Sequence, residues 1–235
     1  MAKTVRPIRI VRDYVKRGEG SCLFQMGDTR VLCVASVENH LPPHAEEKQI
    51  GWVSAEYGML PRAGDKRTQR NRASGSGRSR EISRIVGRSL RAVVDLPALH
   101  PHSIIVDCDV IQADGGTRTA SINGGYIALA DALRYLRRKG ELSSWPLKDH
   151  LAAVSVGIRD GRLLLDLKAE DDVDADVDLN VVMTGSGKYV EIQGTAEGEA
   201  FDERQLRSLL SLARTGIRQI VRKQKRILKT LVPSD

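Results

Sequence analysis

The segment Gly115-Gly116-Thr117-Arg118 has the residue types of an anion-binding loop. It follows an apolar run at 103–111, which predicts a buried strand, and precedes a stretch with helical periodicity. Glycines let an anion approach the backbone N–H groups at a helix start, Thr117 offers a hydroxyl, and Arg118 offers a two-pronged guanidinium. The segment therefore predicts a pocket for inorganic phosphate or a nucleotide phosphate. It is equally compatible with an ordinary helix start capped by Thr117.

Carboxylates gather between residues 170 and 178, where six of nine side chains are acidic. Such a cluster is unfavourable beside a polyanion unless a cation lies within it, and ligands that are all oxygen favour Mg²⁺ or Mn²⁺ over Zn²⁺. Side chains two apart on a strand share a face, so the pattern alone pairs Asp176 with Asp178 at about 6.6 Å. The cluster predicts a divalent-cation site.

Other familiar motifs are absent. The GSGK sequence at 185–188 is not a phosphate-binding P-loop, because Val182 and Tyr189 stand where that motif needs a glycine and a hydroxyl. The glycines at 75 and 77 lack the third glycine of a dinucleotide fingerprint, since Arg80 occupies its place. None of the five histidines has paired zinc spacing.

Cations concentrate in two places, which matters because counterion release needs several cations close together. A Gly- and Ser-rich segment without apolar periodicity predicts an exposed basic loop that binds nucleic acid, or else a solvated loop or subunit contact. Basic residues between 214 and 229 alternate with apolar residues at helical spacing, which predicts an amphipathic helix with a cationic face. The basic loop contains Arg62, Lys66, Arg67, Arg70, Arg72, Arg78 and Arg80 against the single acid Asp65.

The periodicity of the apolar residues predicts an α+β fold. Alternating or short apolar runs predict strands, and a period of 3.6 residues from about Ser79 predicts a helix that ends before Pro97. We expect mixed β-sheets packed against helices in a two-layer α/β arrangement, as a single domain over residues 1–235 with a core at 1–145 and a second part at 146–235. The predicted strands are 8–14, 21–25, 30–37, 52–57, 103–111, 152–158, 163–167, 177–183 and 189–192, the last two joined by a hairpin at 185–187.

Composition excludes several classes of protein. Of the 235 residues, 41% are apolar and 29% charged, which fits neither a disordered chain nor a collagen-like one. Three scattered cysteines are too few for a disulfide framework, so we expect a reducing, cytoplasmic compartment. We expect no membrane span and no secretory signal. The 37 Lys and Arg exceed the 30 Asp and Glu, and the net charge of +7 favours a polyanionic partner.

Long ordered blocks of this sequence resemble the ribonuclease PH family, which is related to polynucleotide phosphorylase and exosome core subunits. The resemblance covers nearly the whole chain. Its blocks are VLCVASVE at 31–38, GWVSAEYGMLPRA at 51–63, EISRIVGRSLRAVVDL at 81–96, DCDVIQADGGTRTASI at 107–122 and DLNVVMTGSGKYVEIQGTAEG at 178–198.

The resemblance implies a phosphate-dependent 3′-to-5′ exoribonuclease that trims transfer-RNA precursors beyond their CCA end and releases nucleoside diphosphates. It also implies Mg²⁺ dependence, inorganic phosphate as co-substrate, a ribosomal-protein-like fold, and a homohexameric ring built as a trimer of dimers. The family's phosphate contacts fall on Arg78, Gly116, Thr117 and Arg118, and its paired catalytic or metal-binding aspartates fall on Asp172 and Asp178.

Asp172 is assigned by the resemblance and not by spacing. One extended strand over residues 172–178 would separate its ends by about 20 Å, too far to share an ion, so we expect the chain to turn between them. The family also usually begins with an extra stretch ending in an Asp-Gly-Arg-type motif, where this chain has only residues 1–5 before Arg6-Pro7-Ile8.

Two other classes of function stay open. One is a non-catalytic RNA-binding subunit of an exosome-like ring, against which the phosphate-binding residues and both aspartates argue. The other is a metal-dependent hydrolase that uses water. Their products differ, since phosphorolysis releases nucleoside diphosphates, hydrolysis releases monophosphates, and a binding subunit releases neither.

Overall fold

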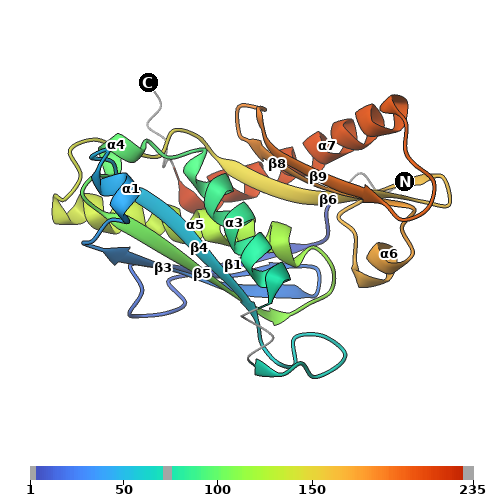
Figure 1. Ribbon diagram of the computed structural model, residues 1–235, viewed down its shortest axis with the longest axis horizontal. Coiled ribbons are helices and arrows are strands. Elements are labelled where there is room, and N and C mark those ends of the chain that lie inside the picture. The colour runs from blue at the N-terminus through green and yellow to red at the C-terminus, as the bar shows by residue number, and fades with distance from the viewer. Residues whose placement is uncertain (1–3, 71–75, 230–235) are drawn as a thin grey trace.

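A computed structural model describes residues 4–70 and 76–229 of the chain. Two β-sheets pack against helices (Figure 1), which confirms the predicted α+β class. The five-stranded sheet has the order β1-β2-β3-β5-β4, and the four-stranded sheet has the order β7-β6-β8-β9. The strands are β1 (Ile8–Arg12), β2 (Gly20–Met26), β3 (Thr29–Glu38), β4 (Trp52–Met59), β5 (Ser103–Gln112), β6 (Leu151–Arg159), β7 (Arg162–Leu165), β8 (Val177–Thr184) and β9 (Tyr189–Ala196).

The first sheet is mixed, because β4 runs parallel to β5 while its other pairs are antiparallel. The second sheet is antiparallel throughout. Its β8–β9 hairpin turns at Gly187, which has a φ of +94°, and this confirms the predicted hairpin. The described helices are α1 (Pro43–Glu46), α3 (Gly77–Arg91), α4 (Leu96–Leu99), α5 (Thr117–Lys139), α6 (Ala169–Val173) and α7 (Glu203–Leu228).

Helix α5 lies at the centre of the molecule, where it contacts the first sheet and β6 of the second (Figure 1). Its close approach to the first sheet depends on Gly124, where an added Cβ would lie 2.7 Å from Cys33 Sγ and 2.9 Å from Phe24 Cβ. Helix α7 packs on β6, β7 and β8. Residues 151–158 of β6 are all buried, so both faces of this strand are covered.

The predicted boundaries differ from the observed ones where local contacts intervene. Helix α3 begins two residues early because the Ser76 hydroxyl accepts a hydrogen bond from Ser79 N at 3.1 Å and caps its first turn. Strand β7 ends at Leu165 because Asp166 takes a φ of +60°. Three short helices, α1, α4 and α6, were not predicted, since helices of four or five residues are too short to show a period.

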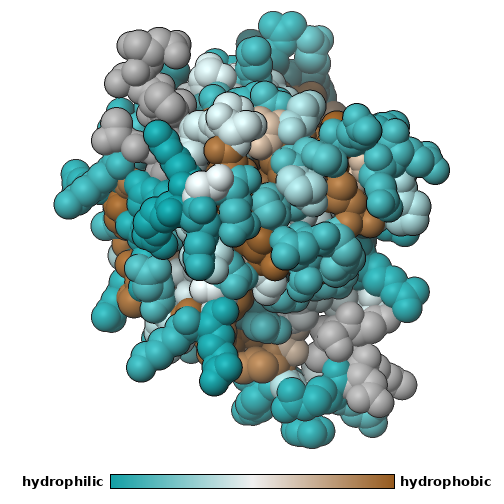
Figure 2. Space-filling model, turned by 90° about the vertical axis from the view of Figure 1, so that its left-hand side faces the viewer, coloured by the Kyte–Doolittle hydropathy of each residue, from teal (hydrophilic) through white to brown (hydrophobic). Residues whose placement is uncertain are grey.

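Hydrophilic side chains cover most of the face in Figure 2, with smaller hydrophobic areas between them. In the described part of the chain, no helix has the combination of length and apolar character that crossing a bilayer requires. The predicted cationic helix is α7, whose Arg218, Arg222, Lys225 and Arg226 are exposed while Ile217, Ile220 and Val221 are buried.

Candidate active site

One pocket of about 450 Å³ brings together the six residues predicted to bind phosphate or to act as paired aspartates. They come from α3, the loop between β5 and α5, helix α6 and strand β8. Residues separated by as much as a hundred positions in sequence therefore share one cavity. The six are Arg78, Gly116, Thr117, Arg118, Asp172 and Asp178, and the lining also includes Met59, Gly64, Asp65, Ala113, Gly115, Ser155, Ala169, Val173, Asn180 and Glu197.

The glycine loop is held in a conformation that favours glycine. Gly115 and Gly116 have φ values of +71° and +64°, and a Cβ on Gly115 would lie 2.5 Å from Leu167 O. The loop thus packs directly against the chain that leads into α6. Thr29 fixes it from the other side, because its hydroxyl donates to Gly115 O at 2.6 Å and accepts from Asp114 N at 2.9 Å.

The contacts of this loop distinguish an anion-binding loop from an ordinary helix start capped by Thr117. Gly116 is the N-cap of α5 and provides no side-chain cap, so the helix starts without the Thr117 cap that an ordinary entry would use. The Thr117 hydroxyl instead lies 2.8 Å from the Tyr57 hydroxyl. The positive end of α5 therefore faces the pocket without a capping side chain, which is the arrangement that suits an anion.

Two arginines act on the Tyr57 hydroxyl, which lies beside Thr117. Burial raises the pKa of Tyr57, while its hydrogen bond to Thr117 and the charges of Arg78 and Arg118 lower that pKa. Both arginines therefore act electrostatically at the point where Tyr57 meets Thr117. Arg118 also donates to Gln193 Oε1, and Gln193 Nε2 donates to Glu81 Oε1 at 2.7 Å, which holds the guanidinium in place.

Protein cations neutralise part of the acidic cluster. Arg159 forms ion pairs with Asp171 at 3.3 Å and with Asp174 at 2.7 Å. Lys168 pairs with Glu170 at 2.5 Å. These three acids therefore need no metal ion to balance their charge. The predicted cation site is limited to the other three acids of the cluster, Asp172, Asp176 and Asp178.

Of these three acids, Asp176 bonds to the backbone, whereas Asp172 and Asp178 line the pocket. Asp176 accepts a hydrogen bond from Asp160 N at 2.9 Å and does not line the pocket, so the pairing of Asp176 with Asp178 that spacing suggested is wrong. The chain is not one extended strand between residues 172 and 178, as expected: Asp172 lies in α6, which ends at Val173, bends at 174 and 176 follow, and Asp178 lies in β8. Both aspartates line the same pocket. Neither has an ion pair among the residues that the structure describes.

The charge of Asp178 is poorly compensated. Burial raises the pKa of its carboxyl, the nearby charge of Asp172 raises that pKa further, Arg118 lowers it, and Glu197 raises it. A carboxylate in such surroundings gains from a nearby cation. Asp172, Asp178, Asn180 and Glu197 all bring oxygen atoms to the pocket.

These donors fit Mg²⁺ in one particular way. The described residues include no group of three or more His, Cys, Asp or Glu side chains arranged to hold a metal ion. Mg²⁺ usually keeps several waters and binds proteins through one or two carboxylates together with substrate phosphates. Asp172 and Asp178 match that pattern and do not match a cage made of protein ligands alone.

Asp178→Asn is expected to raise the free energy of unfolding at neutral pH in a buffer free of divalent cations. Because the pKa of Asp178 is raised in the folded protein, its ionised form destabilises the fold above that pKa. The penalty disappears as pH falls through the folded pKa to below the unfolded value of about 3.9. Urea denaturation at neutral pH and near pH 3 measures the difference, which should be present at the first pH and absent at the second.

Asp174→Asn is the matched control. This substitution removes the ion pair between Asp174 and Arg159. Because the Asp174 side chain is 54% exposed, its loss should lower the free energy of unfolding at neutral pH by about 1 kcal/mol or less. If Asp178→Asn lowers stability in the same way, the carboxylate is not the strained group described above.

The basic segment lies beside this pocket. Arg62, Lys66, Arg67 and Arg70 are exposed, while Gly64 and Asp65 between them line the pocket. Buried Ala63 anchors the segment, because its carbonyl accepts from Ala113 N at 2.8 Å. Arg72 lies outside the described residues.

Several residues of the site were not predicted. Asn180 follows Asp178 by two positions on β8, so strand alternation could have placed both on the pocket face. Tyr57, Glu197 and Arg6, which binds the glycine loop, are brought there by contacts between distant parts of the chain. No local pattern marks these three.

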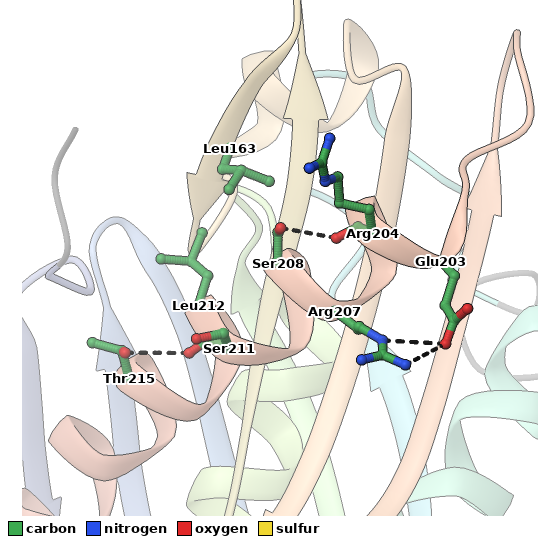
Figure 3. A pocket seen from close by; sticks show the side chains of 8 residues that line it. All are labelled: Leu163, Glu203, Arg204, Arg207, Ser208, Ser211, Leu212 and Thr215. Atoms are coloured by element: carbon green, nitrogen blue, oxygen red, sulfur yellow. Dashed lines mark hydrogen bonds and ion pairs between the residues drawn. The ribbon is translucent and has the colours of Figure 1, made fainter.

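A larger groove on α7 lacks this chemistry. A groove of about 740 Å³ lies between Leu163 and the first half of α7 (Figure 3), where Glu203 and Arg207 face each other in an ion pair of 2.6 Å. The Ser208 and Thr215 hydroxyls turn back to carbonyls of their own helix. Its lining contains neither a glycine loop nor paired carboxylates, so we place the candidate site in the smaller pocket.

Comparison with known proteins identifies the family. A family model described as the 3′ exoribonuclease family, domain 1, matches residues 4–134, and the model of domain 2 of the same family matches residues 149–216. The pocket takes Arg78 and the glycine loop from the first matched stretch, and Asp172 and Asp178 from the second.

Three solved structures share the fold over almost the entire chain. Rice (Oryza sativa) Rrp46 has a TM-score of 0.79 at 17% identity, with 97% of this chain and 98% of that chain covered. The Archaeoglobus fulgidus exosome with RNA bound to the active site has a TM-score of 0.78 at 22% identity, with 95% and 90% covered. An archaeal exosome core has a TM-score of 0.74 at 22% identity, with 97% and 88% covered.

Proposed function

The chain belongs to the 3′ exoribonuclease family, and from that premise we propose that it is a phosphorolytic 3′-to-5′ exoribonuclease acting on transfer-RNA precursors and other RNA 3′ ends. It uses inorganic phosphate and releases nucleoside 5′-diphosphates. The observation that carries this proposal is the shared pocket. One cavity of about 450 Å³ is lined by a helix start without a side-chain cap, by two arginines, and by a pair of carboxylates that have no ion-pair partner within residues 4–70 and 76–229.

Phosphorolysis would give a role to the anion-binding residues and to the two aspartates of the pocket. Orthophosphate binds at the Gly116 backbone, the Thr117 hydroxyl and the guanidinium groups of Arg78 and Arg118. One of its oxygen atoms attacks the phosphorus of the last phosphodiester linkage, and the bond from that phosphorus to the preceding ribose O3′ breaks. The freed O3′ takes up a proton, so the products are a nucleoside diphosphate and an RNA shorter by one residue. The reverse reaction lengthens RNA from nucleoside diphosphates.

Most of the rate then comes from positioning and charge stabilisation, because phosphoryl transfer needs little covalent chemistry from the protein. Asp172 and Asp178 would hold Mg²⁺, or Mn²⁺ in its place, and would assist proton transfer at the leaving ribose oxygen. The metal ion supplies charge neutralisation at the phosphate oxygens.

The proposed assembly rests on the family, and the proposed RNA partner rests on the exposed basic residues. We propose that this chain forms a homohexameric ring, as a trimer of dimers, in the cytoplasm. The similarity to exosome cores supports a ring in general terms, since it shows a shared fold. The exposed basic residues beside the pocket support RNA as the substrate, because clustered cations bind phosphates by releasing counterions.

The alternative is a ring subunit that binds RNA without cutting it, with which the fold shared with exosome proteins is equally compatible. A single assay separates the alternatives. A transfer RNA with a 3′ extension is incubated with and without phosphate, and the released nucleotides are identified. The proposal expects diphosphates that depend on phosphate; monophosphates would show hydrolysis, and no nucleotide at all would show a binding subunit.

Neutralising the basic segment tests the RNA interface. Replacing Arg62, Lys66, Arg67 and Arg70 by glutamine should weaken binding of a 3′-extended transfer RNA and flatten its dependence on salt. Each lost phosphate contact reduces the slope of log K against log salt by about 0.7 for single strands and about 0.9 for a duplex. Binding curves at several salt concentrations give this slope. An unchanged slope, together with a smaller assembly in sedimentation, would assign the segment to a subunit contact.

A further inference from the structure

Arg6 forms the densest set of polar contacts around the glycine loop. Its guanidinium donates to both carboxylate oxygens of Asp166, at 3.0 and 2.8 Å, and its backbone N donates to the same carboxylate at 2.8 Å. The guanidinium also donates to Asp114 O at 2.5 Å and to Gly115 O at 3.4 Å. The Asp166 side chain is fully buried and that of Arg6 is 16% exposed, so water competes little for these bonds.

These contacts join the two halves of the pocket. Asp114 and Gly115 begin the loop that leads to the anion site, and Asp166 lies between β7 and α6, the helix that carries Asp172. A second bond ties the same parts together, because Ala169 N donates to Asp114 Oδ1 at 3.3 Å. Several contacts therefore hold the glycine loop against the segment that leads to Asp172, and most of the hydrogen bonds among them are made by Arg6.

Arg6 also lies directly behind the site. An added Cβ on Gly116 would lie 3.5 Å from the Arg6 Nη2 atom. Arg6 does not line the pocket itself, so it touches the loop and not a bound anion. Its positive charge stands behind the loop that holds the phosphate.

We propose that Arg6 is a positioning residue for phosphate, which fixes the glycine loop relative to Asp172 and Asp178 through its two-pronged pair with Asp166. This inference rests on the proposed function, because it concerns the same phosphate site. It gives the N-terminal segment a role in the site that its position in sequence does not suggest. Loss of the two-pronged pair between Arg6 and Asp166 makes the glycine loop less rigid. Phosphate binding is then weaker, while RNA binding is unaffected.

The chain contains a matched control. Arg12, six residues further along, forms a similar two-pronged pair with Asp131 of α5, at 2.8 and 2.5 Å. The Asp131 side chain is 5% exposed, so this pair is also well buried. Arg12 also donates to Ile227 O near the end of α7, and none of its hydrogen bonds within the described residues reaches a residue that lines the pocket. Arg6→Lys and Arg12→Lys each keep the positive charge and remove the two-pronged pair with an aspartate, so both should lower the free energy of unfolding to a similar extent. Only Arg6→Lys removes a contact to the glycine loop.

The experiment compares the full chain with Arg6→Lys and Arg12→Lys. Calorimetric titration with inorganic phosphate measures anion affinity, and RNA trimming at varied phosphate measures the half-saturating phosphate concentration. Arg6→Lys should weaken phosphate binding roughly 10- to 100-fold and raise the half-saturating concentration equally, with the KM for RNA unchanged. Arg12→Lys should stay within about twofold of the unmodified chain. Asp166→Asn, which breaks the same pair from its other side, replaces Arg6→Lys if that variant does not fold.

Equal phosphate affinities of the two lysine variants would overturn the inference, since a purely structural role predicts this. Absence of phosphate binding to the unmodified chain would overturn it too. Failure of the proposed function is distinct: phosphate binds, Arg6→Lys weakens it, and yet the unmodified chain releases no nucleoside diphosphate. In that case the binding comparison still supports Arg6 as the residue that positions the anion loop.

Discussion

Replacing Asp178 by asparagine should lower kcat for RNA phosphorolysis by about 100- to 1,000-fold, the usual cost of removing one charged group aimed at the reacting phosphate. Asp178 faces the pocket from β8, and the nearby charge of Asp172 contributes to the rise in its pKa. The neutral amide can neither balance a divalent cation nor accept a proton. Steady-state trimming of a 3′-extended transfer RNA measures the loss.

The same substitution separates activity from stability. Asp178→Asn should reduce the rate while the free energy of unfolding at neutral pH rises, because the strained carboxylate is gone. Asp176→Asn is the control, since the Asp176 carboxylate bonds to Asp160 N and lies outside the pocket. Comparable rate losses in both variants would mean that Asp178 has no special place in the reaction.

Arg118→Ala should impair the use of phosphate roughly 10- to 150-fold, which corresponds to about 1.5–3 kcal/mol for one charge-assisted contact. Arg118 follows directly on the glycine loop, and its guanidinium is held by Gln193. Its loss should raise the half-saturating phosphate concentration and leave the KM for RNA nearly constant. Initial rates at several phosphate and RNA concentrations give both constants.

Arg207→Ala serves as the control for the lost positive charge. Arg207 is exposed, pairs with Glu203 and lines the groove on α7, not the candidate site. It should leave the dependence on phosphate unchanged. An Arg118→Ala variant that retains its normal phosphate dependence would remove Arg118 from the phosphate site.

The sequence predicted the elements with strong periodicity. Strand β8 alternates buried and partly exposed residues over 177–181, and α7 repeats its buried residues at helical spacing, so both could be recognised locally. Residues 113–118 were equally informative, because a strand, two glycines and a helix follow one another directly in sequence. These features depend only on neighbouring residues.

Spacing could not find the partner of Asp178. Alternation pointed to Asp176, but the short helix α6 and the bends that follow it replace the extended strand, and Asp172 in α6 lines the pocket. Five residues of helix leave no periodic signal. Arg159 adds a second difficulty, since its pairing with Asp171 and Asp174 shows only in three dimensions which acids are already neutralised.

The supporting residues were beyond prediction for a related reason. Arg6 meets Asp166 across 160 positions in sequence, and Tyr57 meets Thr117 across 60. A single sequence carries no record of such contacts, because they are specified by the packing of both sheets around α5. The fold and the anion loop could thus be predicted, whereas the residues that hold them together could not.

The central claim is that phosphate, and not water, cleaves the RNA, and isotope transfer tests it most directly. RNA carrying a 3′ extension is incubated with ³²P-labelled orthophosphate, and the released nucleotides are separated. The label should appear as the β-phosphate of nucleoside diphosphates, because the attacking phosphate becomes that group. RNA that shortens while all the label stays in orthophosphate would contradict the account.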